Sequence, residues 1–203
     1  MNIMKKILLM VVAAMMATTS VNAQNGYDTK QEVAVSLGGL SNSDIINAFE
    51  TIGGAMVGVT TDNESFFGPV SVEYFYHLNP WLGVGGIIAY GQMSQDLFLA
   101  GKKNGKDGEI KNHYTTLMPA VKFDWLRKSH FGVYSKLAIG ATLRNEKIDY
   151  DSANYDDHDD TSLHVNWQLS LLGLEAGSRQ LRGFLELGTG EQGIALIGLR
   201  YKF

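Results

Sequence analysis

Several features that mark other classes of protein are missing from this chain of 203 residues. It has no cysteine, which excludes a disulfide framework and a lipid anchor attached to cysteine. No run of 18 apolar residues occurs after residue 23, which excludes a membrane-spanning helix from there on. Proline is scarce, with three residues, and the formal charge is −4. The basic face that nucleic-acid binding needs is therefore lacking as well.

The N-terminal segment has the composition of a secretory signal peptide. Two lysines precede an apolar core of 11 residues, and a small polar stretch ends at Ala23. We expect residues 1–23 to be removed by cleavage between Ala23 and Gln24, and residues 24–203 to form one domain. Without the signal, 15 cationic and 21 acidic residues give a formal charge of −6, so we expect no nucleic-acid partner.

The chain is rich in segments where apolar and polar residues alternate, a pattern typical of half-buried strands. Turn signals such as Asn79-Pro80 separate these segments. The expected strands are Gln31–Leu40, Gly68–Leu78, Trp81–Gln92, Lys111–Leu126, Phe131–Lys147, Thr161–Ala176, Leu181–Thr189 and Ile194–Phe203.

The connections between these strands alternate in length. Those after the second, fourth and sixth strands are short, and the link after the seventh is a short exception on the long side. Long connections follow the first, third and fifth strands, at Ser41–Phe67, Ser94–Ile110 and Ile148–Asp160, and the first could contain a short helix at Asp44–Phe49. Short turns at one end and long loops at the other are typical of outer-membrane barrels. We therefore predict an all-β, eight-stranded antiparallel up-and-down transmembrane β-barrel with both termini in the periplasm.

Two interruptions of the strand pattern are expected. Pro119 cannot donate a ladder hydrogen bond, so a bulge or a frayed pairing is predicted there. The alternation breaks at Leu171-Leu172-Gly173, which indicates a β-bulge.

A soluble barrel or sandwich would also alternate, so alternation alone does not say which face is wet. One face carries too many charges for an apolar ligand cavity. The interior of an eight-stranded barrel is just wide enough for side chains to fill it. We therefore expect an interior ion-pair network of Glu73, Lys122, Lys136, Glu186 and Arg200, with Asp124 and Lys202 on the same face.

The opposite face ends in aromatic residues beside the short turns, as in the aromatic girdle of a membrane protein. The girdle residues are Tyr74, Tyr76, Trp81, Trp125, Tyr201 and Phe203.

The last strand carries a second indication of a membrane barrel. Every second residue is apolar, and this face ends in two aromatic residues. It resembles the C-terminal signature of bacterial outer-membrane barrels, in which a terminal Phe is read by the assembly machinery. The residues of this assembly signal are Ala195, Ile197, Leu199, Tyr201 and Phe203.

Further motifs carry a family resemblance. They are Tyr74-x-Tyr76, Asn79-Pro80-Trp81, Gly83-x-Gly85-Gly86, Leu185-Glu186-Leu187-Gly188 and Arg200-Tyr201-Lys202-Phe203. With them the chain resembles the small outer-membrane β-barrel proteins of Bacteroidota, with an OmpA/OmpX-like barrel. The resemblance implies outer-membrane lipid and lipopolysaccharide as surroundings. It also implies barrel-assembly machinery and periplasmic chaperones as partners during biogenesis. The family has no single function.

The first functional hypothesis is a non-enzymatic, structural or surface-interacting protein that acts through its extracellular loops, needs no cofactor and binds a partner that the sequence does not name. A lipid A-modifying enzyme is the alternative, because Ser162 and His164 lie two apart and face the same side of a strand. We expect His164 to be an interior residue, however, and the order differs from the His-then-Ser pattern of the lipid A deacylases. A small pore is the further alternative.

Metal binding has weaker support. The acidic segments 149–151 and 156–160 could offer oxygen ligands to Ca²⁺, but they lack the turn Gly and final Glu of an EF-hand. A solvated loop is the expected state. His77, His113, His130 and His158 show no metal-ligand spacing.

Overall fold

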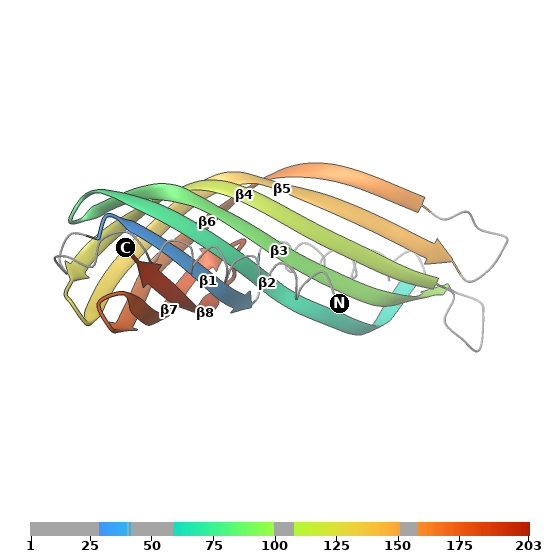
Figure 1. Cartoon of the computed structure of the whole chain (residues 1–203). Helices are drawn as coiled ribbons and strands as arrows, with labels where there is room; N and C mark the ends of the chain where they lie inside the picture. Colours follow the sequence, from blue (N-terminus) through green and yellow to red (C-terminus); the bar gives the residue numbers. More distant parts are fainter. Residues whose placement is uncertain (1–28, 40, 42–58, 100–107, 151–157) are drawn as a thin grey trace.

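The computed structural model describes residues 29–39, 41, 59–99, 108–150 and 158–203. Within them, eight strands follow one another around a closed antiparallel barrel, in which the first also pairs with the last (Figure 1). This confirms the predicted all-β, up-and-down architecture. The strands are β1 (Gln31–Gly39), β2 (Val59–Asn79), β3 (Leu82–Leu99), β4 (Gly108–Arg127), β5 (Phe131–Tyr150), β6 (His158–Gly177), β7 (Leu181–Gly190) and β8 (Ala195–Lys202).

Several predictions fall outside the described residues. They are the signal peptide, its cleavage between Ala23 and Gln24, the helix at Asp44–Phe49 and, of the acidic segments, residues 151, 156 and 157. None of the described residues forms a helix with the length and hydropathy needed to span a bilayer.

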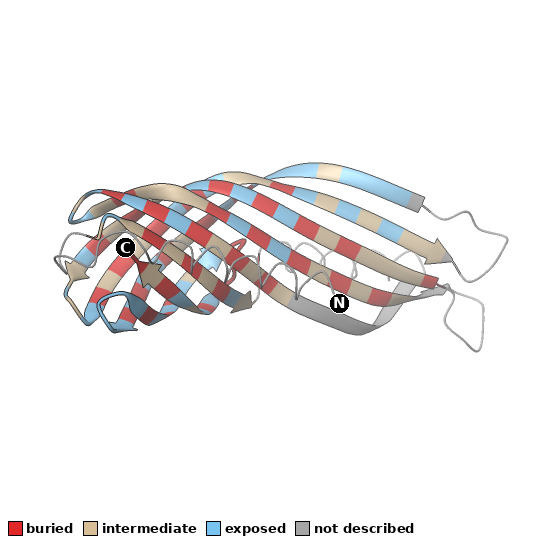
Figure 2. Ribbon diagram, in the orientation of Figure 1, coloured by how far each residue is buried: buried red, intermediate tan, exposed pale blue. Residues whose placement is uncertain are grey.

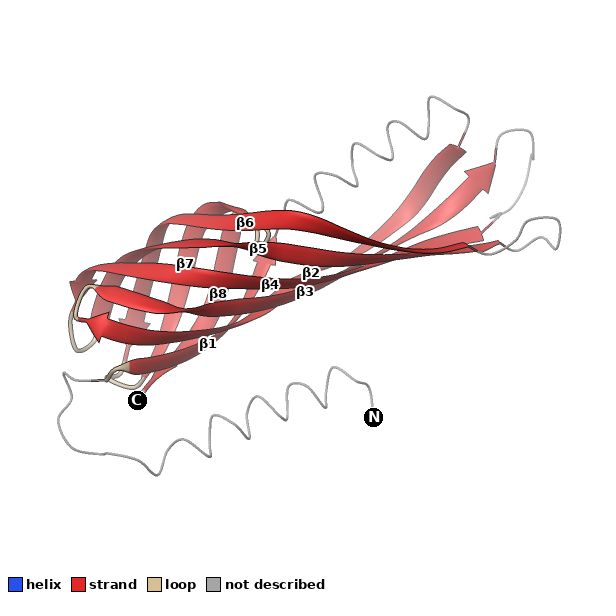
Figure 3. Cartoon of the chain, turned by 90° about the horizontal axis from the view of Figure 1, so that it is seen from above, coloured by secondary structure: helices blue, strands red, loops and turns tan. Residues whose placement is uncertain are grey.

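The strands fall into two classes of length. β2 to β6 have 18 to 21 residues, whereas β1, β7 and β8 have 9, 10 and 8. A tilted strand needs about 9–11 residues to cross a bilayer. The five long strands therefore continue as a sheet beyond the closed barrel, as Figures 1 and 3 show. We call this continuation the tall sheet.

The predicted bounds of the three long loops are too wide, because parts of each loop are strands of the tall sheet. Ser94 pairs with Lys111, Lys111 with Lys147, and Lys147 with Asp159. The predicted strands ended where apolar alternation ended. Cross-strand hydrogen bonds and residue pairs nevertheless hold polar segments as strands when the neighbouring strands continue alongside them.

Of the two predicted interruptions, one is a bulge. The register of β6 against β7 shifts between Ser170 and Leu172, which confirms the bulge predicted there. At Pro119 no bulge occurs: pairing of β4 with β5 skips this residue, but the register is the same on both sides. Pro119 remains paired with Gly86 of β3. Its missing N–H therefore interrupts one ladder locally without adding a residue to the strand.

The two faces of the barrel wall differ sharply in chemistry. Figure 2 shows buried and exposed residues alternating along the strands. Inward side chains include many buried charges, while large apolar side chains cover the outer wall, among them Ile88, Leu117, Ile139, Leu185 and Ile197. The barrel is thus polar inside and apolar outside.

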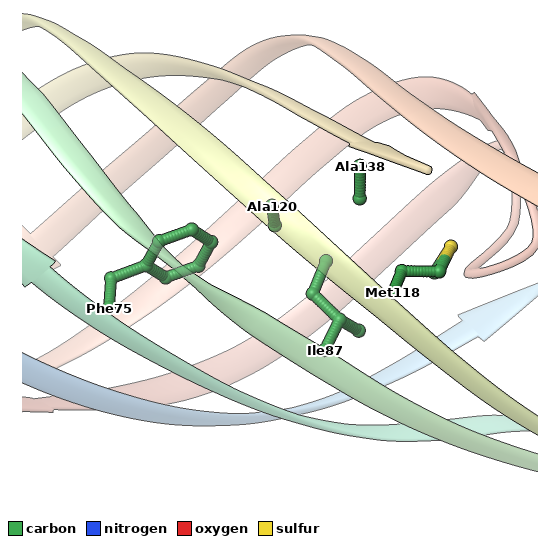
Figure 4. Close-up of a cluster of buried hydrophobic side chains, with 5 residues drawn as sticks. All are labelled: Phe75, Ile87, Met118, Ala120 and Ala138. Atoms are coloured by element: carbon green, nitrogen blue, oxygen red, sulfur yellow. The ribbon is translucent and has the colours of Figure 1, made fainter. Parts of the chain in front are cut away.

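The interior also holds a small apolar cluster on the wall formed by β2 to β5 (Figure 4). Its members are Phe75, Ile87, Met118, Ala120 and Ala138. The charged side chains therefore share the interior with a narrow apolar strip.

Candidate functional site

The interior ion pairs form two connected layers. In the first, Lys136 of β5 lies between Glu73 of β2 and Glu186 of β7, forming ion pairs with both, the second at 2.8 Å. Arg200 of β8 approaches the same two carboxylates, at 3.4 Å from Glu73 and 3.7 Å from Glu186. Four of the five residues predicted to form the network thus meet around one point.

The fifth predicted residue, Lys122, belongs to the second layer. Its Nζ lies 2.6 Å from Glu32, 3.4 Å from Asp124 and 3.7 Å from Glu175. Arg200, 2.7 Å from Glu175, joins the two layers.

Glu175 is the centre of this second layer. It forms ion pairs with Arg182 at 2.5 Å and with Lys202, in addition to Lys122 and Arg200. Four cations around one buried carboxylate give it strong electrostatic stabilisation in a medium of low dielectric constant.

Sequence reasoning missed Glu175, Glu32, Arg182 and Tyr134 as members of the network. Glu175 follows the β6 bulge, which shifts the alternation so that an odd-numbered residue points inward. Glu32 lies on the charged face of β1, a signal that was available in its alternation.

Tyr134 links the layers in another way. Its hydroxyl donates to Glu186 at 2.6 Å. Its ring lies beneath Lys122 Nζ at 4.2 Å and the Arg200 guanidinium at 4.5 Å. Cations over the face of an aromatic ring are stabilised by its quadrupole. Tyr134 therefore fills the centre of the barrel and binds charges of both signs.

The short link between β7 and β8 folds into the barrel and closes it at the tall-sheet end. We call residues 191–193 the plug turn. Gln192 Nε2 donates to Ser71 at 2.7 Å and to Glu73 at 2.8 Å, while its backbone N–H donates to Gln168 at 2.8 Å. Glu191 accepts from Asn166 at 2.7 Å. All three plug-turn residues are buried.

Backbone geometry explains why the plug turn uses glycine. Gly193 has φ +109°, a conformation that L side chains rarely adopt. A Cβ at Gly38 of β1 would lie 1.7 Å from the carbonyl oxygen of Gln192, so β1 and the plug turn touch through backbone. The link between β7 and β8, which was the one short connection on the side of the long loops, therefore lies inside the barrel.

The outer wall presents an apolar band bordered by the predicted aromatic girdle. Trp81 stacks on Phe123 with ring centroids 6.4 Å apart, and Tyr201 stacks on Phe203 at 5.9 Å. Trp125 is 72% exposed. The residues of the predicted assembly signal lie on this same wall, on or beside β8, where β8 closes the barrel against β1.

The height of the band can be followed along β5. Outward residues are mostly apolar from Phe131 to Leu143 and polar from Asn145 onward, where Lys147 is also exposed. The twelve steps from Phe131 to Leu143, at about 3.3 Å each and tilted by about 45°, rise roughly 28 Å. This matches the hydrocarbon thickness of a bilayer, about 30 Å.

The pair proposed for the enzyme alternative is not interior. His164 is exposed and Ser162 is half-buried, so the prediction of an interior His164 was wrong. These residues pair with Thr142 and Arg144 of β5, whereas pairing of β6 with β7 begins only at Gln168. At their height the described barrel is open on this side, so the inner face of β6 is also exposed.

The tall sheet carries exposed charge pairs. Lys147 lies 2.7 Å from Asp149, and Lys111 lies 3.1 Å from Glu109 and 3.7 Å from Asp149. The hydrogen bond from Lys147, together with the charges of both lysines, holds the pKa of Asp149 below its usual range. Arg144, on the other face, pairs with Glu146 at 2.5 Å.

The tall sheet also has a backbone edge along β6. No strand in the described ranges pairs with its segment 158–166 on the side away from β5. Trp167 C=O accepts from Glu191 on that side. Backbone groups alternate along a strand, so those of Asp159, Thr161, Leu163 and Val165 face the same open side.

Comparisons with known proteins add a likeness of shape. No protein-family model matches the sequence, and no curated protein matches it. The structure is similar to the crystal structure of Ail, the attachment invasion locus protein of Yersinia pestis, in complex with the heparin analogue sucrose octasulfate. There the identity is 12%, the TM-score 0.45, and the match covers 86% of this chain and 99% of that one. A second Ail structure gives 13% identity, a TM-score of 0.44, and coverage of 85% and 96%. We take the architecture from the strand pairing itself.

Proposed function

We propose that this protein is an integral protein of the bacterial outer membrane that presents the tall sheet outside the cell as an interaction surface, without catalytic activity. The observation that carries the proposal is the division of the long strands into an apolar band and a polar continuation. The turns after β2, β4 and β6 and both chain termini would face the periplasm. Kinship with the small Bacteroidota barrels rests on the sequence motifs.

Physical chemistry supports the membrane placement. An outer wall of exposed apolar side chains would be a liability in water but suits lipid. A closed barrel satisfies backbone hydrogen bonds across the band, as hydrocarbon requires. The buried charges point away from this wall and are paired inside.

The open edge of β6 supports a role in interaction. An unpaired edge is a template for strand addition by a partner segment. The edge of β2 is less suitable, because two register shifts, between Asp62 and Ser65 and between Phe67 and Val70, interrupt it and Pro69 lies beside the second. The β6 segment 159–166 pairs with β5 without a shift. We therefore assign partner binding to the β6 edge.

Orientation can be tested with single cysteines, because the chain has none of its own. We expect Lys147→Cys in the tall sheet to react with a membrane-impermeant maleimide on intact cells. Arg179→Cys in the β6–β7 turn should react only after the outer membrane is permeabilised. The reverse pattern would overturn the orientation. Migration on a gel that does not change with boiling would overturn the barrel in the membrane.

The assignment of binding to the β6 edge can be tested with two substitutions at Thr161, because neighbouring residues of the strand direct their N–H groups to opposite sides. Thr161 has its N–H toward the open side, and Ser162 has its N–H toward β5. Thr161→Pro removes one edge donor and should abolish binding to an array of eight-residue strand-forming peptides, while Thr161→Val retains it. Equal binding by both variants would contradict assignment to the edge.

The pore alternative has no support in the packing. Arg200, Tyr134, Lys122, Lys136 and Gln192 fill the interior and are essentially inaccessible. We expect no single-channel conductance in planar bilayers. Lipid A from cells with and without the protein should give the same mass spectrum, and a difference that depends on Ser162 or His164 would restore the enzyme alternative.

A further inference from the structure

A groove runs over the outer wall on the side of the short strands. It has a volume of about 820 Å³ and is lined mainly by outward residues of β5, β6, β7, β8 and β1, with the inward residues Ser36, Glu175, Phe184 and Arg200 beneath them. Its floor is formed by Ala176 and Gly183, which are paired neighbours on β6 and β7. Larger side chains stand around this floor, among them Phe131, Leu174 and Leu199.

The floor is open rather than filled by a neighbouring side chain. A Cβ added at Gly183 would meet only the Ala176 carbonyl oxygen, at 4.0 Å. In a close-packed interior such a gap would be rare. On a lipid-facing wall it leaves space for a flexible chain from outside.

One end of the groove lies beside two cationic turns. These are residues 127–130, between β4 and β5, and residues 177–180, between β6 and β7. Arg182 Nη2 holds them together by donating to the carbonyl oxygens of Lys128 at 2.7 Å and Ser129 at 3.0 Å. Gly177 N–H also donates to His130 O at 2.9 Å.

The charge on these turns is of one sign. They contain Arg127, Lys128 and Arg179 and no acidic residue. Lys128 and Arg179 are exposed, and neither has an ion-pair partner within the described part of the chain. Both also line a hollow of about 450 Å³ at the mouth of the barrel, together with Lys30, Arg182 and Lys202.

We propose that this groove is a binding site for a phospholipid of the periplasmic leaflet, with an acyl chain over Ala176 and Gly183 and the phosphate on Lys128 and Arg179. The inference rests on the proposed membrane orientation. Apolar attraction alone does not select this face, because the surrounding lipid is as apolar as the wall. Selection comes from the fit of a chain to the groove and from the cations of the two turns beside its end.

The test uses the full protein reconstituted in phosphatidylcholine vesicles that contain a phosphatidylglycerol probe with a photoreactive acyl chain. Labelled peptides are identified by mass spectrometry. In the wild type we expect labelling to concentrate on 174–185 and 197–201. Gly183→Leu should fill the groove and lower the share of labelling there by more than about threefold.

Gly86→Leu is the matched control. Gly86 faces outward from β3, and an added Cβ there would meet only the Met118 carbonyl oxygen, at 3.5 Å. This variant should leave labelling of the groove unchanged. Lys128→Ser with Arg179→Ser should lower it by about fivefold per charge, and high salt should have the same effect on the wild type.

Several outcomes would overturn the site. Even labelling around the wall, or equal effects of Gly183→Leu and Gly86→Leu, would show that the groove selects no lipid. A dimer that chemical cross-linking captures and Gly183→Leu disrupts would show that a second copy occupies this face. Absence of label from the entire wall, Ile88 and Ile139 included, would instead contradict the membrane barrel itself.

Discussion

The closed barrel and the tall sheet share the five long strands β2 to β6, yet different interactions hold them. In the barrel every strand has two neighbours, and ionised groups such as Lys136 and Glu186 are fully buried. In the tall sheet the edge strands β2 and β6 have only one neighbour each among the described residues, and the Lys147 side chain is 52% exposed. Exposed ion pairs contribute about 0–1 kcal/mol, whereas breaking a buried one costs about 3–5 kcal/mol.

This difference separates an anchor from a surface. The interior network fixes the barrel, because each buried charge loses its compensation when a partner is removed. The tall sheet is held by its backbone ladder and by exposed ion pairs such as Lys147 with Asp149.

The largest effect is expected at the centre of the network. Glu175→Gln leaves Arg182, Arg200 and Lys202 without their shared carboxylate, and should lower the free energy of unfolding by about 3–5 kcal/mol. Urea unfolding in detergent micelles, followed by gel migration, measures this. The control is Asp159→Asn, an exposed acid of the tall sheet, with an effect within about 0.5 kcal/mol. Equal effects would contradict the comparison between anchor and surface.

The next effect concerns the plug turn. Gly38→Ala places a Cβ against the Gln192 carbonyl and should cost about 2–3 kcal/mol by displacing the turn. Its neighbour Gly39 has no heavy atom within 4 Å of an added Cβ. Gly39→Ala should therefore leave stability nearly unchanged. The same unfolding assay compares them, and similar losses would show that the plug turn is not fixed by β1.

A smaller, local effect should separate the two sides of the β6 backbone. Ser162→Pro removes a hydrogen bond to β5 and should open the tall sheet locally at a cost of about 1.5 kcal/mol. Thr161→Pro should cost less than about 1 kcal/mol, because its N–H faces the open side. Hydrogen exchange of β5 amides near Arg144 and Asn145 reports the difference. Fast exchange in both variants would show that the edge is not free.

The smallest effect is a pH dependence in the tall sheet. The pKa of Asp149 is lowered in the folded protein, so the ionised carboxylate stabilises the folded tall sheet. This stabilisation is present above the usual pKa of aspartate and is lost as the pH falls through the lowered value. NMR titration of the carboxyl carbon should show a rise in the pKa of Asp149 in Lys147→Ala. No rise would mean that the pair seen at 2.7 Å does not persist in solution.

Much of the fold could be predicted because its determinants are local. Alternation from Val33 to Leu37, or from Leu181 to Leu187, places one face on the outer wall and the other inside. It thereby predicts the strand, its orientation and the closure of an even-numbered barrel. The inward charges Glu73, Lys136, Glu186 and Arg200 could be chosen on the same basis.

The tertiary structure decided those features that depend on pairing with adjacent strands. The β6 bulge turned Glu175 inward, the end of β7 left His164 exposed, and the pairing of Lys147 with Asp159 made strand out of a polar stretch. The contact between Gly38 and Gln192 joins residues 154 positions apart. The sequence by itself therefore determined which way most side chains point, because that depends on a two-residue period. Which charges meet, and where the wall ends, depends on register between strands, which only the closed structure establishes.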